Sequence, residues 1–463
     1  MPNAIASPRL LVGQARSLES SGPLRLFTVF LLYAGQGIPL GLFDFAIPAW
    51  MAVNGASAAD IGFLVAMSGI PWSFKFIAGF LIDRYAILSM GRRRCWIIGA
   101  QAVIVVFLII FAIMNPGAKD VVLLGMVALA VNTAVVFQDV AVDALTVDIL
   151  EEKERAIGGS LATGGQVIGI AASASLAGLI VYSFGAGAAY LVCAGLVLVV
   201  TAHLIWLTER KGERRLPWTR GTTHPFNLKY APEGWLPMLK ATLRNTFAPI
   251  SLAWIPVIMV KGLVYGTCLV FFPLVASQYA GWSEADIGSV NGTAQLVAGI
   301  VSIAIGGFFV ARIGAQRAML AFTLCSIGLL AWMLASQSAW ADPGNITIFG
   351  FGWTIIYVLG GIGQVVIIMR LSPPRIAAAQ YSIYMAFSNM GISIAGILIA
   401  AVAIFSTPQG MLMLLIGGQV VAGLILLVVK FPTRQIGRSR EPGAQVAGAQ
   451  DEQASSDPQA GRA

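Results

Sequence analysis

Long apolar stretches separated by short polar segments dominate the pattern of this sequence. Each stretch reaches the roughly 20 residues with which a helix crosses the hydrocarbon core of a bilayer, and few charged residues interrupt them. Such stretches predict transmembrane helices. They lie near residues 25–50, 59–83, 95–114, 121–148, 156–183, 186–207, 247–278, 285–311, 316–338, 346–370, 376–405 and 408–431. The pattern therefore predicts an all-α membrane protein with twelve transmembrane helices.

The basic residues test this arrangement independently, because cytoplasmic loops of membrane proteins carry an excess of Lys and Arg. With both termini in the cytoplasm, all of the 29 basic residues except Lys75, Lys119 and Lys261 fall at or beyond the cytoplasmic ends of the predicted helices. Hydrophobic residues make up 57% of the chain and charged residues 11%, too few to cover a soluble core. The formal charge of +8 then reflects topology and contact with anionic lipid. It is poorly explained by nucleic-acid binding.

The chain also repeats itself. The sequence Ala-Asp-Ile-Gly opens the second predicted helix at 59–62 and the eighth at 285–288, and a Gly-Phe pair followed by an arginine recurs near the end of both. The repeat predicts two pseudo-symmetric halves whose relative rocking gives alternating access to a cavity between them. The predicted organisation is a cytoplasmic tail 1–24, a six-helix half 25–207, a basic cytoplasmic linker 208–245, a six-helix half 246–431, and a disordered cytoplasmic tail 432–463.

Three charged residues lie inside predicted helices of the first half. Asp139 and Asp143 are four residues apart and share one helix face, and Lys75 lies at a comparable depth on the second helix. Charge at this depth in a membrane is costly and marks a functional site. A carboxylate that alternately takes a proton and pairs with Lys75 predicts proton coupling. A static ion pair that fixes helix register and a direct substrate contact are the alternatives.

Two further charges lie in helices that the repeat makes equivalent, Asp44 in the first and Lys261 in the seventh. Both are predicted to line the central substrate cavity, where they would suit a zwitterionic or polyanionic ligand, or provide a proton site at Asp44 and an anion site at Lys261. The alternative is that each side chain snorkels toward water. The other predicted cavity residues are polar positions within helices, where a packing hydrogen bond is the competing interpretation: Gln36, Gln364, Gln380 and Tyr381.

The most specific motif follows the second helix and contains Asp83, Arg84, Gly91, and the arginines Arg92, Arg93 and Arg94. It resembles the cytoplasmic signature of the major facilitator superfamily. The resemblance implies a twelve-helix major facilitator fold in which these residues form a cytoplasmic gate with the opposite half. The alternative is that Asp83 only orients its own loop and the neighbouring arginines.

Further matches narrow the resemblance. The Lys75-Phe76 pair, Gln138-Asp139 with Asp143 and Asp148, and Ala379-Gln380-Tyr381 are similar to the AmpG-type permeases, a branch that includes muropeptide permeases, acetyl-CoA transporters and siderophore importers. The resemblance implies a symporter of the bacterial inner membrane that imports anhydromuropeptide or a similar peptide–sugar conjugate with protons. Two positions depart from it: Val264 stands where those permeases carry an acid, and Asp44 where they carry a small polar residue.

The residues from Gln36 to Phe43 resemble the siderophore-importing relatives equally well, so a siderophore importer is the alternative, and an exporter a weaker one. The chain lacks the sequence motifs of a metal- or serine-dependent hydrolase and of a nucleotide-binding loop, so we expect neither an enzyme nor an ATP-driven pump. A membrane receptor or sensor would need a larger soluble domain. The four cysteines are scattered singly, which predicts packing residues and no metal site. We expect a monomer without cofactors whose partners are protons, a small-molecule substrate and the lipid bilayer.

Overall fold

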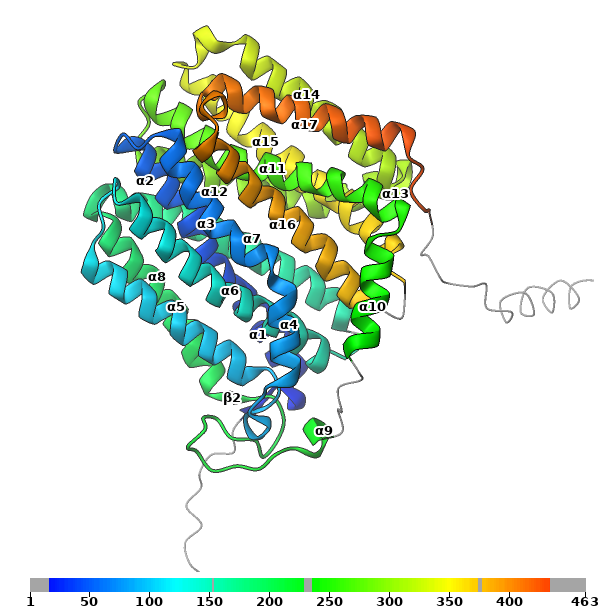
Figure 1. Ribbon diagram of the computed structural model, residues 1–463. Coiled ribbons are helices and arrows are strands. Elements are labelled where there is room, and N and C mark those ends of the chain that lie inside the picture. The colour runs from blue at the N-terminus through cyan, green and yellow to red at the C-terminus, as the bar shows by residue number, and fades with distance from the viewer. Residues whose placement is uncertain (1–15, 152–153, 229–234, 374–376, 434–463) are drawn as a thin grey trace, which may run out of the picture.

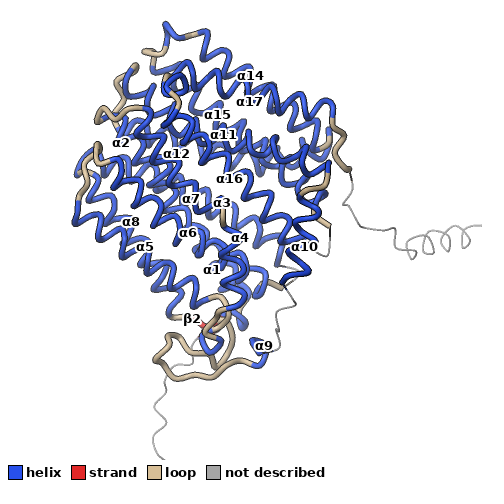
Figure 2. The backbone as a smooth tube through the Cα atoms, in the orientation of Figure 1, coloured by secondary structure: helices blue, strands red, loops and turns tan. Residues whose placement is uncertain are grey.

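A computed structural model describes residues 16–151, 154–228, 235–373 and 377–433 of the chain, almost all of them helical (Figures 1 and 2). Most of the two predicted tails therefore lies outside the described residues. Ten helices in the described part are long and apolar enough to cross a membrane. The fold is that of an all-α membrane protein, as the apolar pattern predicts.

The N-terminal half contains eight α-helices and two short strands. Strands β1 (Arg16–Ser17) and β2 (Leu207–Thr208) pair in parallel at its two ends. The helices are α1 (Gly22–Gly41), α2 (Ile47–Val53), α3 (Ala58–Ser73), α4 (Lys75–Arg84), α5 (Arg94–Met114), α6 (Val121–Ile149), α7 (Arg155–Phe184) and α8 (Ala186–Ile205). A π-helical turn, Leu42–Ala46, joins α1 to α2 without interrupting the span.

The linker and the C-terminal half follow. The linker carries α9 (Pro225–Leu228) and α10 (Trp235–Thr246), neither of which the sequence pattern predicted. The helices of the half are α11 (Pro249–Gln278), α12 (Glu284–Val301), α13 (Gly307–Ile313), α14 (Ala315–Ala335), α15 (Pro343–Leu371), α16 (Ala377–Ala401) and α17 (Pro408–Val428). A π-helical turn, Ser302–Gly306, lies between α12 and α13.

The second predicted span is interrupted, and neither of its two parts is among the ten helices that meet the criterion for crossing a membrane. The prediction of one continuous helix over 59–83 is wrong, because the chain breaks at Phe74 between α3 and α4. Pro71 lies one turn before the break and cannot donate a backbone hydrogen bond, which weakens the helix there. In the other half, the predicted helix 285–311 runs through α12, the π-helical turn and α13 without a break in the helical backbone.

The sequence repeat marks the same structural feature in both halves. Ser57 and Asp60 form a reciprocal capping box at the start of α3, and Ser283 and Asp286 form one at the start of α12. In a capping box the two side chains satisfy backbone N–H groups that would otherwise lack partners. The repeated Ala-Asp-Ile-Gly therefore begins equivalent helices, which supports the pseudo-symmetry predicted for the two halves.

The two halves meet along α3 with α16 and α7 with α12. Hydrogen bonds between described residues of the halves include Asn54 to Glu284, Ser175 to the Gly288 carbonyl, and Asn389 to the Trp72 carbonyl. These contacts lie between the middle of the bundle and the end where α2, α3 and α12 begin or end, opposite the linker helices (Figure 1). The bundle is therefore closed at the end away from α9 and α10.

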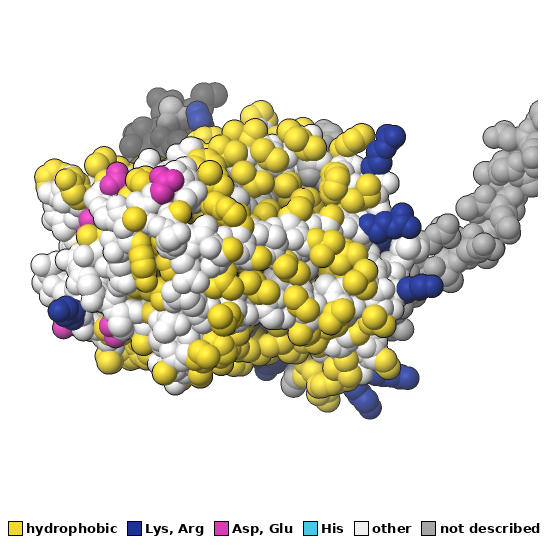
Figure 3. Space-filling model, turned by 90° about the horizontal axis from the view of Figure 1, so that it is seen from above, with side chains coloured by type: hydrophobic (Ala, Val, Ile, Leu, Met, Phe, Trp, Pro, Cys, Tyr) yellow, Lys and Arg dark blue, Asp and Glu magenta, His cyan; other side chains and the backbone are white. Residues whose placement is uncertain are grey.

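The exterior carries an apolar belt. On α5, for example, the exposed residues Val103, Val106, Ile110 and Ile113 follow helical spacing on its outer face. Figure 3 shows hydrophobic side chains over the middle of the molecule, basic side chains gathered at one end, and acidic side chains mainly at the other. A belt of this kind suits contact with lipid tails, with the charged ends in water.

Candidate functional site

Lys75 and Asp139 form an ion pair inside the N-terminal half. The Lys75 Nζ atom lies 3.0 Å from Asp139 Oδ2, and the two side chains are 14% and 8% exposed. The sequence placed these residues at similar depths without showing whether they pair, and the structure brings them together. A lysine and a carboxylate buried in contact compensate each other's charge where water cannot.

Two residues of α1 complete the cluster. Gln36 donates from Nε2 to the second oxygen of Asp139, Oδ1, over 2.5 Å. Tyr33 donates its hydroxyl to Asp143 Oδ1 over 2.5 Å. Gln36, predicted as a cavity residue, contacts the carboxylate predicted for coupling, whereas Tyr33 was not singled out by the sequence. Each carboxylate is thus held by a side chain from α1, so three helices position the pair.

The break in the second span determines where Lys75 sits. Lys75 is the first residue of α4, directly after Phe74. A cation at a helix N-terminus is unfavourable because the unpaired N–H groups carry partial positive charge, so the Asp139 carboxylate also compensates that end of α4. Asp139 and Asp143 come from successive turns of α6 and face α1 and α4 together. The local geometry agrees with both a coupling pair and a static pair, so the coupling role remains a prediction.

A chain of hydrogen bonds extends from this cluster toward Asp44. Trp72 lies 5.9 Å from Lys75 Nζ, measured to the ring centroid, and donates its indole N–H to Asn132 over 3.0 Å. Asn132 donates to Ser68 over 2.9 Å, and Ser68 donates to Asp44 Oδ1 over 3.3 Å. An indole and an amide do not relay protons as hydroxyls and carboxylates do. The chain therefore aligns side chains between the two carboxylates and connects their positions.

Asp44 also joins the two halves. It lies in the π-helical turn after α1, and its Oδ2 atom accepts a hydrogen bond from Tyr265 of α11 over 3.3 Å. No ion pair to Asp44 is found within the described residues. Asp44 therefore lies between the first and seventh spans, as its predicted position requires, and contacts a tyrosine of the other half.

Lys261 and Asp44, both predicted to line the central cavity, line different cavities in this structure. Lys261 lines a cavity enclosed by α11, α14, α15 and α17, all within the C-terminal half. Its Nζ atom lies 3.9 Å from the centroid of the Tyr357 ring. Tyr265, Trp353 and Tyr357 pack together, and this aromatic group separates the ammonium of Lys261 from Asp44.

The remaining predicted cavity residues have partners within the protein. Gln364 donates to Ser388 over 3.5 Å, and Gln380 donates to Thr246 over 3.0 Å, so both link α16 to its neighbours. These contacts favour the packing interpretation for the two glutamines. Tyr381 of α16 interacts electrostatically with Lys75 across the boundary between the halves. Tyr381 therefore lies near enough to the ion pair to feel the charge of Lys75.

The predicted gate motif is only partly open to description. The Asp83 side chain lies outside the described residues, while Arg84 is exposed beside the Tyr85 ring. Arg93 pairs with Asp148 of its own half over 3.0 Å. Arg94 donates to the carbonyl groups of Met90, Leu204, Arg214 and Arg215, that is, to its own half and the linker. These arginine contacts hold the linker against the N-terminal half. The gate prediction expected the motif to bond to the C-terminal half, whereas these contacts of Arg93 and Arg94 are to the N-terminal half and the linker. Contact of Asp83 with the C-terminal half stays a prediction.

Glu209 explains the glycine and arginines of the motif, and the sequence analysis missed it. Its carboxylate accepts the backbone N–H groups of Arg92, Arg93 and Arg94 over 2.7–3.0 Å at the start of α5. Gly91 has φ +97°, and a Cβ atom there would collide with this carboxylate, so glycine is required twice over. Burial, and next the Glu209 charge, raise the pKa of nearby Glu213.

We expect Glu209→Ala to lower the thermal stability of the purified protein clearly. Three buried N–H groups would lose their acceptor, each at a cost of about 1–3 kcal/mol where water cannot replace it. Glu209→Gln keeps one oxygen acceptor and should lose less. Thermal unfolding in detergent measures the effect of both substitutions. Glu19→Ala is the control, because Glu19 is an exposed acid close to β1, as Glu209 is close to β2. An unchanged midpoint for Glu209→Ala would show that the carboxylate does not stabilise the motif.

Comparison with known proteins decides the family. Residues 26–396 match the model of the Major Facilitator Superfamily, which spans most of the chain. The chain belongs to the major facilitator superfamily. Among relatives, it is 27% identical to the anhydromuropeptide permease of Escherichia coli over 393 residues, covering 80% of this chain and 74% of that protein. It is 23% identical to a folate-biopterin transporter of Synechocystis over 403 residues, covering 82% and 74%.

The fold agrees with this assignment. The crystal structure of the nucleoside transporter NupG superimposes with a TM-score of 0.66 at 14% identity, covering 88% of this chain and 99% of that one. At this identity the likeness speaks for the fold alone. Together these matches identify a multi-pass membrane transporter of the major facilitator superfamily with an AmpG-like sequence.

Proposed function

We propose that this protein is a proton-driven importer of the bacterial inner membrane whose substrate is an anhydromuropeptide or a similar peptide–sugar conjugate. The observation that carries the proposal is the Lys75–Asp139 ion pair, buried in a transporter fold beside the contact between the two halves. A buried carboxylate that can exchange a lysine for a proton is a coupling device that such a fold can use. The likeness to the anhydromuropeptide permease supports the substrate class.

The pair can influence the contact between the halves because it adjoins that contact. Asn389 of α16 donates to the Trp72 carbonyl over 3.3 Å, and the hydroxyls of Ser73 and Ser393 lie 3.4 Å apart. Lys75 follows Ser73 by two positions and Trp72 by three. A proton on Asp139 removes the charge that holds Lys75, which frees α4 to move against α16. Protonation thereby biases the packing on which the alternation between the two accessible states depends.

The conformation fits one state of this cycle. With both termini in the cytoplasm, the closed end of the bundle faces outward, and the cytoplasmic side is the one from which substrate and proton leave. Asp139 then releases its proton inward and pairs with Lys75. The gate of Asp83 and Arg84 with the helix that follows 374–376 closes in the opposite, outward-facing state. This order gives import coupled to inward proton flow.

Uptake into membrane vesicles tests the proposal. Vesicles that contain the protein should accumulate labelled anhydromuropeptide only when the outside is more acidic, and a protonophore should abolish the accumulation. Vesicles without the protein are the control. Uptake that does not respond to the pH gradient would contradict proton coupling. Ferric siderophore, tested in parallel, would replace the proposed substrate if it alone is accumulated.

A further inference from the structure

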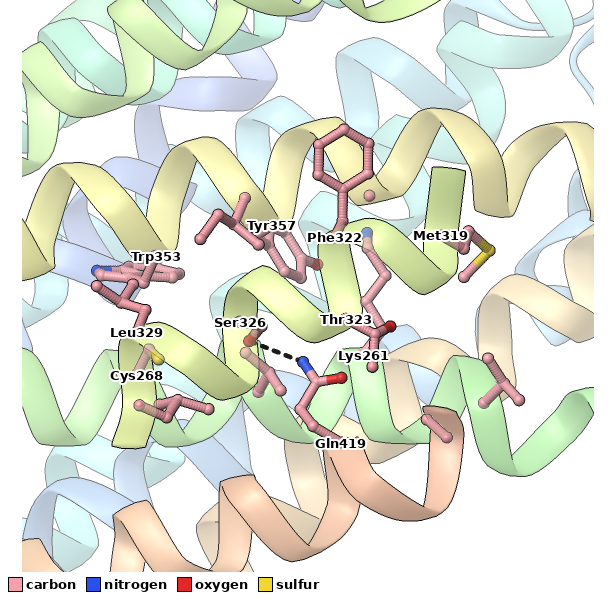
Figure 4. Close-up of a pocket in the computed structure, with 16 residues that line it drawn as sticks. Lys261, Cys268, Met319, Phe322, Thr323, Ser326, Leu329, Trp353, Tyr357 and Gln419 are labelled. Atoms are coloured by element: carbon pink, nitrogen blue, oxygen red, sulfur yellow. Dashed lines mark hydrogen bonds between the residues drawn. The ribbon is translucent and has the colours of Figure 1, made fainter. Parts of the chain in front are cut away.

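A second lysine in the interior of the protein, Lys261, is partly buried in the C-terminal half, in surroundings that differ from those of Lys75. The cavity that it lines has a volume of about 50 Å³ and is bounded by α11, α14, α15 and α17 (Figure 4). One water molecule needs roughly 10–15 Å³ by the same measure. The cavity therefore has room for roughly four groups of the size of a water molecule. A small organic molecule, or one end of a larger one, has this size.

Lys261 has no counter-charge in this cavity. None of the described residues that line it is an Asp or Glu. Within the described part of the chain, the ammonium makes neither an ion pair nor a hydrogen bond, and its near neighbour is the face of Tyr357 at 3.9 Å. Lys75, in contrast, has Asp139 at 3.0 Å. An aromatic face attracts a cation less strongly than a carboxylate does at this depth, so the charge of Lys261 is left largely uncompensated.

Polar groups of α14 and α17 also line the cavity. Gln419 of α17 donates to Ser326 of α14 over 3.0 Å, and the Thr323 hydroxyl lies one turn away on α14 (Figure 4). Hydroxyl groups rotate to donate to an anion. The other walls are apolar and include Phe322 and Leu329. The cavity thus offers one cation and hydroxyl donors on one part of its surface, and apolar side chains on the rest.

We propose that this cavity binds a small carboxylate, with Lys261 as its counter-ion. One carboxylate balances the single positive charge, and its two oxygens can reach both the ammonium and the hydroxyl groups of α14. The short apolar remainder of such a molecule fits the apolar walls. A phosphate carries up to two charges, which one lysine does not neutralise. This site lies outside the Lys75 cluster, and its existence does not depend on the proposed substrate.

The bound carboxylate can come from two sources. The Lys261 cavity adjoins a narrow gap, too small for a water molecule, whose lining includes Asp44, and Cys268 and Trp353 line both. Movement of the aromatic residues between them would connect the C-terminal half with the boundary between the halves. The carboxylate is then either a free small acid or an acidic group on the transported molecule. Competition between a small acid and the proposed substrate for the Lys261 cavity distinguishes these sources.

Equilibrium binding of labelled acetate to the purified full-length protein tests the site. We expect saturable binding that Lys261→Met weakens at least tenfold, because the methionine fills the space without the charge. Lys240→Met, which removes an exposed lysine of α10, should bind like the unchanged protein. Sodium chloride at equal ionic strength controls for screening. No saturable binding, or equal binding by Lys261→Met, would overturn the proposal.

Thermal unfolding gives a second readout that does not rely on weak binding alone. Acetate should raise the unfolding midpoint of the unchanged protein and of Lys240→Met, and should leave Lys261→Met unmoved. Without acetate, Lys261→Met should be at least as stable as the unchanged protein, because an uncompensated charge has been removed. An equal acetate response in all three proteins would also overturn the proposal. Displacement of bound acetate by anhydromuropeptide would assign the site to the transported molecule, and its absence to a free acid.

Discussion

Asp139→Asn is expected to abolish accumulation of substrate against a concentration gradient while the protein still folds and inserts. The substitution keeps the shape of the side chain and the hydrogen bond to Gln36, but it removes the group that can carry a proton. Exchange of labelled for unlabelled substrate across the membrane needs no net proton movement, so it should persist. Accumulation and exchange, measured in the same vesicles, separate coupling from binding.

Asp120→Asn is the matched control, because it makes the same chemical change at an exposed loop position. It should accumulate substrate normally. If Asp139→Asn accumulates substrate with unchanged pH dependence, then Asp139 is not the coupling residue and the static ion pair is the better interpretation. Loss of exchange together with accumulation would instead indicate a substrate contact.

Lys75→Ala should destabilise the protein more than the double variant Lys75→Ala with Asp139→Asn. Removal of one partner leaves a buried charge without compensation, at a cost of roughly 3–5 kcal/mol. Removal of both charges relieves that cost. A thermal-stability cycle of the two single variants and the double variant measures the interaction directly.

The cycle has its own control, in which Lys75→Ala is combined with Asp120→Asn. Residues that far apart should contribute independently, so their effects should add. Additive effects for Lys75 and Asp139 as well would show that the 3.0 Å contact contributes no interaction energy. The expected large coupling would show that it does, whatever the role of Asp139 in transport.

The sequence predicted the helical architecture well and the interruption of the second span poorly. Hydropathy averages over about 19 residues, so it locates a span such as 59–83 but does not register a change of backbone direction at one residue. Pro71 is visible in the sequence, but the place of the break at Phe74 and the contacts of α3 and α4 with α16 appear only in the folded chain. The capping boxes were visible as a repeat, although their structural meaning was not.

The site was predictable where a charge stood out against an apolar background. Lys75 and Asp139 were found that way. Asn132 and Trp72 were not, because single polar atoms inside an apolar run have no periodic signal. Glu209 lies in a linker rich in charge, so nothing in the sequence separated it from its neighbours. The direction in which Lys261 points depends on helix rotation, which its repeat-related position did not fix.

At the closed end of the bundle, the two halves meet through main-chain surfaces. A Cβ atom on Gly62 would lie 3.0 Å from the Gly396 carbonyl, and one on Gly288 would lie 2.7 Å from the Ala174 carbonyl. Glycines at these crossings let the backbones touch directly. The close contact between the two halves therefore depends on small residues near the starts of α3 and α12. These residues are different from the interior side chains that would bind the substrate. Substitutions of interior side chains can consequently change the substrate preference of such a bundle, while the glycines that close it stay the same.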